Sequence, residues 1–202
     1  MRSVLNIIFM ESNKIIGGKI QSIRESRNLT IGDVAERSGV DKELIERIEN
    51  NVEIPSLAPL IKIARVLGVR LGTFLDDQTE LGPVICRAKD VKKQNSILFT
   101  NDSKVPHKHM EYHSLSQDKA ARHMDPFLID IETSDKSDFT LSSHEGEEFI
   151  YVLEGVVEVI YGKTVHILHV GDSIYYDSIV AHHVHAPDEV SAKILGVIYT
   201  PF

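Results

Sequence analysis

The stretch SSHEGEEFIYVLEG, residues 142–155, decides how the second half of this chain is interpreted. It holds one histidine and four carboxylates, and its last nine residues have the composition of a strand followed by a tight turn. Such a polar cluster at a strand entrance is either a metal centre or a solvated, negatively charged strand end. The rest of the chain bears on that choice.

Around this stretch, apolar residues alternate with a period of two, the pattern of half-buried strands. The turns Glu154–Gly155 and Gly162–Lys163 fall between runs close enough to form hairpins. Many short strands without intervening helices predict a closed or sandwiched antiparallel barrel. The predicted strands are PFLIDIE (126–132), EEFIYVLEG (147–155), VVEVIYG (156–162), TVHILHVG (164–171), DSIYYDS (172–178), HHVHA (182–186) and KILGVIY (193–199).

The first part of the chain has a different period. From Gly18 to Leu75 the apolar residues recur at helical spacing, and Thr30 and Asp41 stand where helix N-caps are expected. Five short helices in fewer than 60 residues form a compact bundle. The polar segment DDQTELGPV, residues 76–84, marks the junction between the two parts.

The fold class is therefore α+β, with two domains. We expect a tail over residues 1–9, a helical domain over 10–76, a linker over 77–88 and an all-β domain over 89–202.

Charge is divided unevenly between the two parts. Residues 1–75 carry 11 Lys and Arg against 9 Asp and Glu, whereas residues 76–202 carry 11 against 21, which gives +2 and −10 and sums to −8. Phosphate contacts supply most non-specific affinity for nucleic acid, so the helical part is the better DNA partner. The single cysteine, Cys86, favours a reducing, cytoplasmic location, and no apolar run reaches the roughly 20 residues of a membrane span.

Residues 18–75 closely resemble the helix-turn-helix domain of the Cro and lambda-repressor family, the XRE type. The similarity rests on Leu29-Thr30, Ala35, Gly39, Ile48-Glu49, Pro55-Ser56, Ala64 and Leu67-Gly68. It implies a five-helix bundle that binds DNA as a homodimer, with a structural ion pair between Arg24 and Glu49.

In that family the third helix enters the major groove with its amino-terminal residues. The resemblance therefore implies DNA contacts from Thr30, Lys42, Glu43, Glu46 and Arg47. Two glutamates on a reading face depart from the pattern, because a carboxylate repels phosphate and is useful only as an acceptor from cytosine. The alternative is a helical module kept for dimerisation, with little DNA binding.

Two further stretches, 142–155 and 171–186, resemble the two motifs of the cupin family, a jelly-roll barrel. His144, Glu148 and Gly155 keep the positions of the first motif, and Gly171 and His182 keep those of the second. Departures from the family pattern are Ser142 in place of a histidine, and Asp177, Ile179 and Ala186 in place of a proline, a glycine and an asparagine.

The matched cupin positions coordinate a divalent metal in that family. The resemblance implies that His144, Glu148 and His182 converge inside the barrel as a facial triad suited to iron, zinc or manganese. The alternative is a metal-free barrel whose polar residues bind an organic effector directly. We expect Ser142 and Tyr112 to face that effector.

For the other polar residues of the second domain, the sequence gives little evidence of metal or effector binding. Glu145 and Glu147 alternate with the matched positions and are expected to point outward. Which of His182, His183 and His185 point inward depends on strand register. The cluster His107, His109 and His113 is expected to lie on the surface.

A helix-turn-helix domain joined to a cupin is also the layout of hydroxypropylphosphonate epoxidase, a mononuclear iron enzyme. Tyr112 falls where that family places a tyrosine near substrate, but Asn28 stands in place of its active-site lysine. Two functions remain open, beside a third alternative in which the cupin is a scaffold with no surviving ligand site. The first is a transcription regulator whose cupin domain binds a small-molecule effector. The second is a non-haem iron oxygenase acting on a small organic acid, with Tyr112 orienting substrate.

Overall fold

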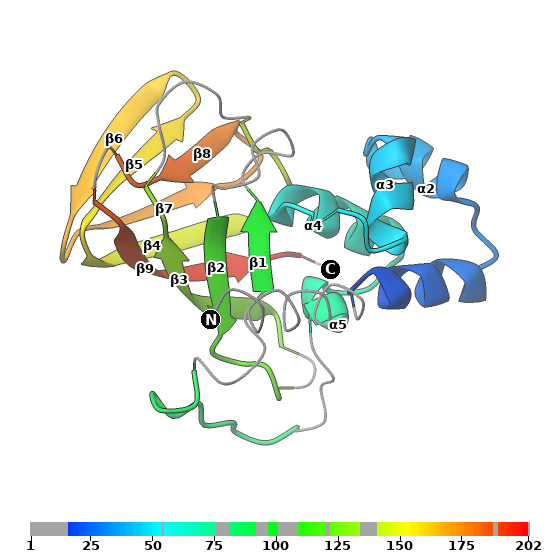
Figure 1. Cartoon of the computed structure of the whole chain (residues 1–202), viewed down its shortest axis with the longest axis horizontal. Helices are drawn as coiled ribbons and strands as arrows, with labels where there is room; N and C mark the ends of the chain where they lie inside the picture. The colour runs from blue at the N-terminus through cyan, green and yellow to red at the C-terminus, as the bar shows by residue number, and fades with distance from the viewer. Residues whose placement is uncertain are drawn as a thin grey trace.

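The computed structural model describes residues 16–53, 55–75, 81–91, 97–100, 109–119, 122–133, 141–187 and 190–201. A bundle of helices lies on one side of the molecule and a β-barrel of two sheets on the other (Figure 1). The predicted tail over residues 1–9 lies outside the described residues.

The predicted five-helix bundle is confirmed. Residues 16–26 are helical and are followed by four helices of five to ten residues. These are α2 (Ile31–Ser38), α3 (Lys42–Glu49), α4 (Leu57–Val66) and α5 (Leu71–Leu75).

Local hydrogen bonds explain where α2 and α3 begin and end. The Thr30 hydroxyl accepts from the backbone N–H of Asp33 at 3.0 Å, and the Asp33 carboxylate accepts from the Thr30 N–H at 2.7 Å, which completes a capping box. Gly39 ends α2 with φ of 67°, a left-handed conformation that glycine adopts without a Cβ clash. Asp41 caps α3 by accepting from the Leu44 N–H at 3.1 Å.

The interior of the bundle contains one buried ion pair. Arg24 Nε and Nη2 donate to the two oxygens of Glu49 at 2.7 and 2.8 Å, and both side chains are at most 10% exposed. The expected structural pair is therefore confirmed. The apolar core of the bundle includes the fully buried Ile20, Ile45, Ile48, Leu60, Ile63, Leu67 and Phe74.

The second domain is the expected barrel, built from a six-stranded sheet in the order β1-β2-β3-β9-β4-β7 and a three-stranded sheet in the order β6-β5-β8. All pairs of neighbouring strands are antiparallel. The strands are β1 (Ile97–Thr100), β2 (His109–Ser114), β3 (Met124–Ile131), β4 (Glu147–Glu154), β5 (Val156–Tyr161), β6 (Thr164–His169), β7 (Ser173–Asp177), β8 (His182–His185) and β9 (Ala192–Tyr199).

All seven predicted strands are present, whereas β1 and β2 had not been predicted. In β2 the apolar Met110 and Tyr112 alternate with the polar Glu111 and His113, so the sequence has a period of two although His113 is itself buried. The two histidines and one glutamate among the six residues of β2 make the segment too polar to be recognised as a strand from its sequence.

One predicted hairpin is confirmed and the other is wrong. Gly162–Lys163 joins β5 to β6, and Tyr161 pairs with Thr164. Glu154–Gly155 instead carries the chain from the six-stranded sheet to the three-stranded one, because β4 pairs with β7 and β9. Gly155 has φ of 76°, and a Cβ there would lie 2.5 Å from the Ser191 carbonyl oxygen. Close packing of the backbone at this crossover thus requires glycine.

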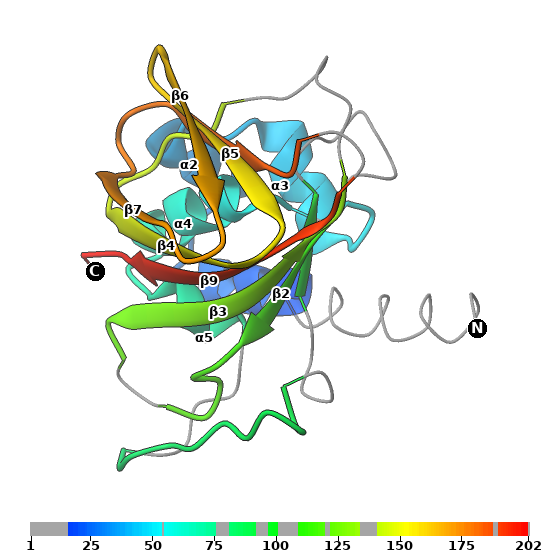
Figure 2. The same cartoon turned by 90° about the vertical axis from the view of Figure 1, so that its left-hand side faces the viewer.

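Helix α4 lies between the barrel and helices α2 and α3, and the view from the barrel side places these helices behind the sheets (Figures 1 and 2). Arg65 of α4 forms an ion pair with Glu145 at the barrel rim. Arg70, just before α5, donates to the Arg122 carbonyl oxygen at 3.1 Å. Arg65 and Arg70 thus bring the two domains into polar contact.

Residues 81–91 between the domains contain neither helix nor strand. The domain boundaries at 76, 77–88 and 89 stay predictions. None of the helices within the described ranges is long and apolar enough to cross a membrane.

Candidate metal and effector site

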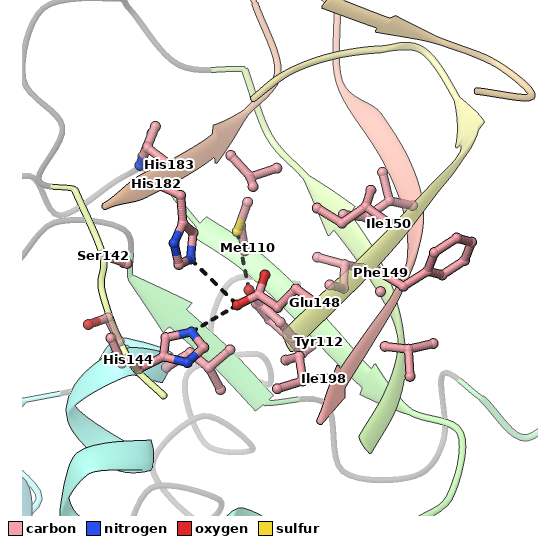
Figure 3. A pocket seen from close by; sticks show the side chains of 18 residues that line it. Met110, Tyr112, Ser142, His144, Glu148, Phe149, Ile150, His182, His183 and Ile198 are labelled. Carbon is pink, nitrogen blue, oxygen red and sulfur yellow. Dashed lines mark hydrogen bonds and ion pairs between the residues drawn. The ribbon is translucent and has the colours of Figure 1, made fainter. Parts of the chain in front are cut away.

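A cavity of about 70 Å³ opens where the barrel meets α4 (Figure 3). Its wall takes residues from both sheets and from the first turn of α4. The predicted residues Tyr112, Ser142, His144, Glu148 and His182 all line this one cavity.

Backbone hydrogen bonds hold the segment before β4 against the other sheet. Ser142 and His182 exchange two such bonds, at 2.7 and 2.8 Å. The His144 N–H donates to the Ser178 carbonyl at 3.0 Å, and the Ser178 N–H donates to the Gly146 carbonyl at 2.9 Å. These bonds bring His144 and His182 together although 38 positions separate them in the sequence.

Three side chains meet at one carboxylate oxygen. Oε1 of Glu148 lies 2.8 Å from Nε2 of His144 and 3.5 Å from Nε2 of His182. One ligand atom from each residue lies within 4.8 Å of the others, and both imidazoles are at most 5% exposed. Figure 3 shows the two rings directed at this carboxylate from different parts of the barrel.

The hydrogen bond of the second nitrogen indicates the tautomer of each neutral ring. Nδ1 of His182 is 2.8 Å from the Val180 carbonyl oxygen, and Nδ1 of His144 is 3.2 Å from that of Glu145. A carbonyl only accepts, so Nδ1 carries the proton in both rings, and in neutral imidazole Nε2 is then a lone pair. Two lone pairs aimed at a carboxylate oxygen need a proton or cation between them. The donor set therefore fits a divalent metal, with backbone carbonyls orienting the ligands from behind.

The other oxygen of Glu148 accepts a hydrogen bond from Tyr176, which the sequence analysis does not identify as a site residue. The Tyr176 hydroxyl donates to Oε2 at 2.6 Å, and Tyr176 is 5% exposed. Tyr176 faces Glu148 directly across the β4–β7 pair. Nothing in the local sequence of β7 marks it, because the contact depends on which strand pairs with β4 and in which register.

Burial and hydrogen bonding act in opposite directions on these groups. Burial raises the pKa of Glu148, but the hydrogen bonds of its carboxylate with His144 and His182 outweigh it, so the pKa lies well below the usual range. For His182, burial lowers the pKa, and the bond to Glu148 outweighs it and raises the pKa. Burial and the neighbouring Glu148 charge both raise the pKa of Tyr176, so its hydroxyl stays a donor.

Tyr112 forms part of the floor of the cavity. Its hydroxyl lies 3.4 Å from the Met110 sulfur, and its ring packs edge-on against Phe127 with centroids 5.5 Å apart. Burial, followed by the Glu148 charge, raises the pKa of Tyr112. Tyr112 is thus a neutral, buried group that borders the cavity.

The expectation that His113 lies on the surface is wrong. It is 2% exposed, and its Nε2 lies 3.2 Å from Asp130 and 3.8 Å from Glu111. Pairing of β2 with β3 places these side chains together, which the isolated sequence of β2 does not reveal. His107 and the side chain of His109 lie outside the described residues.

The neighbours of the triad follow strand alternation only in part, since His183, next to His182, also lines the cavity. Glu145 pairs with Arg65, and Glu147 accepts from the Tyr175 hydroxyl, both away from the cavity. His183 and His185 are both buried, with ring centroids 5.3 Å apart, and His182 is the ring that faces Glu148.

On the helical side, both basic residues of the predicted reading helix are paired with carboxylates. Lys42 Nζ lies 3.8 Å from Glu46, and Arg47 Nε lies 2.5 Å from Glu53. Glu43 is exposed, and Thr30 is exposed while it caps α2. The positive charge of α3 is therefore largely offset within the domain.

Two family models match the chain: a helix-turn-helix model over residues 20–74 and a cupin domain model over residues 130–198. The HTH-type transcriptional regulator SutR of Escherichia coli is 21% identical over 93% of this chain and 96% of its own length. The regulator SinR of Bacillus subtilis is 34% identical over 33% of this chain, and the match spans 60% of SinR.

Solved structures align with more than nine tenths of this chain. An HTH_3 family transcriptional regulator from Vibrio cholerae superposes with a TM-score of 0.69 at 24% identity, over 96% of this chain and 99% of that one. Hydroxypropylphosphonic acid epoxidase from S. wedmorenis covers 93% of this chain and 98% of that one, with a TM-score of 0.47 at 24% identity. The Vibrio similarity establishes the fold.

Proposed function

We propose that this chain is a DNA-binding transcriptional regulator. It joins an XRE-type helix-turn-helix domain to a cupin barrel. It acts as a homodimer on a pseudo-palindromic operator, in the reducing cytoplasm that its single cysteine favours. The cupin domain binds a small-molecule effector through a divalent metal, for which iron, zinc and manganese all suit the ligand set.

One observation carries the effector site. Two imidazole Nε2 atoms point at the same oxygen of Glu148 inside a buried cavity, with their Nδ1 atoms held by backbone carbonyls. A divalent cation held by His144, Glu148 and His182 would satisfy all three groups and would supply open coordination positions for an effector. Tyr176 keeps the carboxylate oriented by holding its second oxygen.

The route from the barrel to the DNA-binding domain is short. His144 is followed by Glu145, which pairs with Arg65 on α4, and α4 packs against α2 in the bundle. A shift of the 142–146 segment on effector binding is therefore transmitted to the helices that support α3. Coupling of this kind amounts to about 1–3 kcal/mol in known regulators.

DNA binding by the full chain tests the regulator. A duplex from the upstream region of its own gene, titrated at low salt, should bind more tightly than random duplex. Lys42→Ala at the start of α3 should weaken binding at least several-fold, because it removes a cation from the predicted interface. Lys62→Ala on α4 makes the same change of charge outside α3 and should not. Equal affinity for random and upstream duplex, with and without metal, would refute the proposal.

A second candidate is a mononuclear iron oxygenase acting on a small organic acid. The observation in its favour is that Tyr112 borders the same cavity as the three ligands. Iron(II) would supply oxygen activation, and Tyr112 would orient the substrate with its neutral hydroxyl. Oxygen consumption by iron-loaded protein with a panel of 2-hydroxy acids, abolished by Glu148→Ala, would establish this function.

A further inference from the structure

We propose that the ligand site of the cupin domain is completed by the DNA-binding domain, and that its ligand is a small 2-hydroxy or 2-oxo acid with an uncharged apolar tail. This inference rests on the proposed function and names the ligand class and the way in which the ligand is sensed. It comes from the wall of the cavity rather than from the three metal-ligand positions alone.

The first turn of α4 forms part of the cavity wall. Ser56, Leu57 and Ala58 line the same cavity as Ser142 and His144, and Ala58 is only 6% exposed. In Figure 3 the helix stands beside the labelled Ser142 and His144, on the side of the cavity that carries the imidazoles. Since α4 belongs to the helical domain, a bound ligand touches that domain directly.

The volume of the cavity limits the size of the ligand. A volume of about 70 Å³ corresponds to roughly five water positions, at about 10–15 Å³ each. This space suits a molecule of few non-hydrogen atoms and excludes nucleotides and sugars. It also means that one added side-chain carbon or two in the wall compete with the ligand.

The distribution of charge limits it further. The polar atoms gather around His144, Glu148 and His182, with Ser142 and His183 beside them, whereas most of the remaining wall is apolar, with Met110, Ile129 and Ile194. Among the described residues that line the cavity there is no lysine or arginine. A carboxylate at the apolar end would lose its hydration without gaining a cation, so a second acidic group is strongly disfavoured. One chelating head group at the metal end, with an uncharged tail, matches this wall.

Calorimetric titration of the Mn²⁺-loaded full chain tests the ligand class. We would use 2-hydroxybutyrate, malate and butyrate, which share four carbons. Malate replaces the terminal methyl by a carboxylate, and butyrate lacks the hydroxyl that completes the chelate. Binding of 2-hydroxybutyrate should be at least ten-fold tighter than that of the other two. Equal or tighter binding of malate would overturn the proposed class.

The role of α4 is tested by filling the wall from its side. Ala58→Leu should weaken 2-hydroxybutyrate binding at least ten-fold, whereas Lys62→Ala on the same helix should leave it unchanged. Leu57→Ala, which enlarges the cavity, should also change the affinity. It provides a second test in case Ala58→Leu does not fold. Unchanged affinity in both wall variants, each with a wild-type circular dichroism spectrum, would refute the two-domain site.

The ligand-binding experiments and the DNA-binding experiment can fail independently of each other. DNA binding by the metal-loaded protein without ligand tests the regulator alone. If DNA binds and 2-hydroxybutyrate does not bind better than malate, the regulator stands and the ligand class is wrong. If 2-hydroxybutyrate binds as expected and no DNA preference is found, the two-domain site stands and the regulator fails.

Discussion

Tyr176 and Glu148 face each other across the β4–β7 pair, and the tyrosine hydroxyl donates to Oε2 of the carboxylate at 2.6 Å. The carboxylate thus presents only Oε1 to the imidazoles of His144 and His182. One tyrosine on a neighbouring strand thereby leaves a single oxygen of Glu148 for the proposed cation.

Removing that hydroxyl should loosen the metal site. Tyr176→Phe keeps the ring but frees Oε2, and loss of such an outer partner typically costs 10–100-fold in metal affinity. Competition with a chromophoric chelator would measure the affinity for Zn²⁺. Tyr161→Phe is the matched control, since its ring lies 5.3 Å from that of Tyr176 and its hydroxyl bonds to a backbone carbonyl. Zn²⁺ affinity equal to wild type in Tyr176→Phe would contradict this role.

Metal removal should lower the thermal stability of the protein. A ligand at 100 times its dissociation constant stabilises the native state by about 2.7 kcal/mol, which corresponds to roughly 5–10 °C for a chain of this size. Differential scanning calorimetry with and without EDTA would measure the shift. Glu148→Ala should abolish it, whereas Glu147→Ala, one residue away and outside the cavity, should retain it. A persistent shift in Glu148→Ala would place the metal elsewhere.

The capping box of α2 makes stability depend on acid pH. Hydrogen bonds from the Thr30 hydroxyl and backbone lower the pKa of Asp33, so its stabilising contribution is complete above the usual carboxyl range and is lost as pH falls through the lowered value. Thr30→Ala should bring the Asp33 pKa back towards normal in an NMR titration. It should also reduce the free energy of unfolding by about 1 kcal/mol at neutral pH.

Ser56→Ala provides a control for that change. Ser56 occupies the N-cap of α4 but makes no side-chain cap hydrogen bond, so its substitution should change the free energy of unfolding by much less. A loss equal to that of Thr30→Ala would mean that the capping box does not account for the effect.

The buried pair in the helical domain should show a large, non-additive effect. Arg24→Met leaves Glu49 buried without its cation and should cost about 3–5 kcal/mol in urea denaturation. Arg24→Met combined with Glu49→Leu should recover most of that loss, because neither charge then remains. Lys42→Met, at the exposed pair with Glu46, should cost at most about 0.5 kcal/mol. Additive losses in the double variant would contradict the pairing.

Local signals made much of this fold predictable. Helical caps such as Thr30 and Asp41, the turn at Gly39 and the period of two in the strands act over a few residues, so they can be read from the chain. The hairpin predicted at Gly155 was wrong because it rested on a local signal alone. A glycine turn is visible locally, but which strands it connects depends on pairing with β9, about 40 residues later.

The sequence by itself determined the two domain types and supplied His144, Glu148 and His182, because family motifs and periodicity are properties of neighbouring residues. Only the tertiary structure decided what surrounds them. It brought Tyr176 to Glu148, buried His113 beside Asp130 and placed α4 in the wall of the cavity. These contacts depend on strand register and on the docking of one domain against another, and both are set by packing between segments distant along the chain.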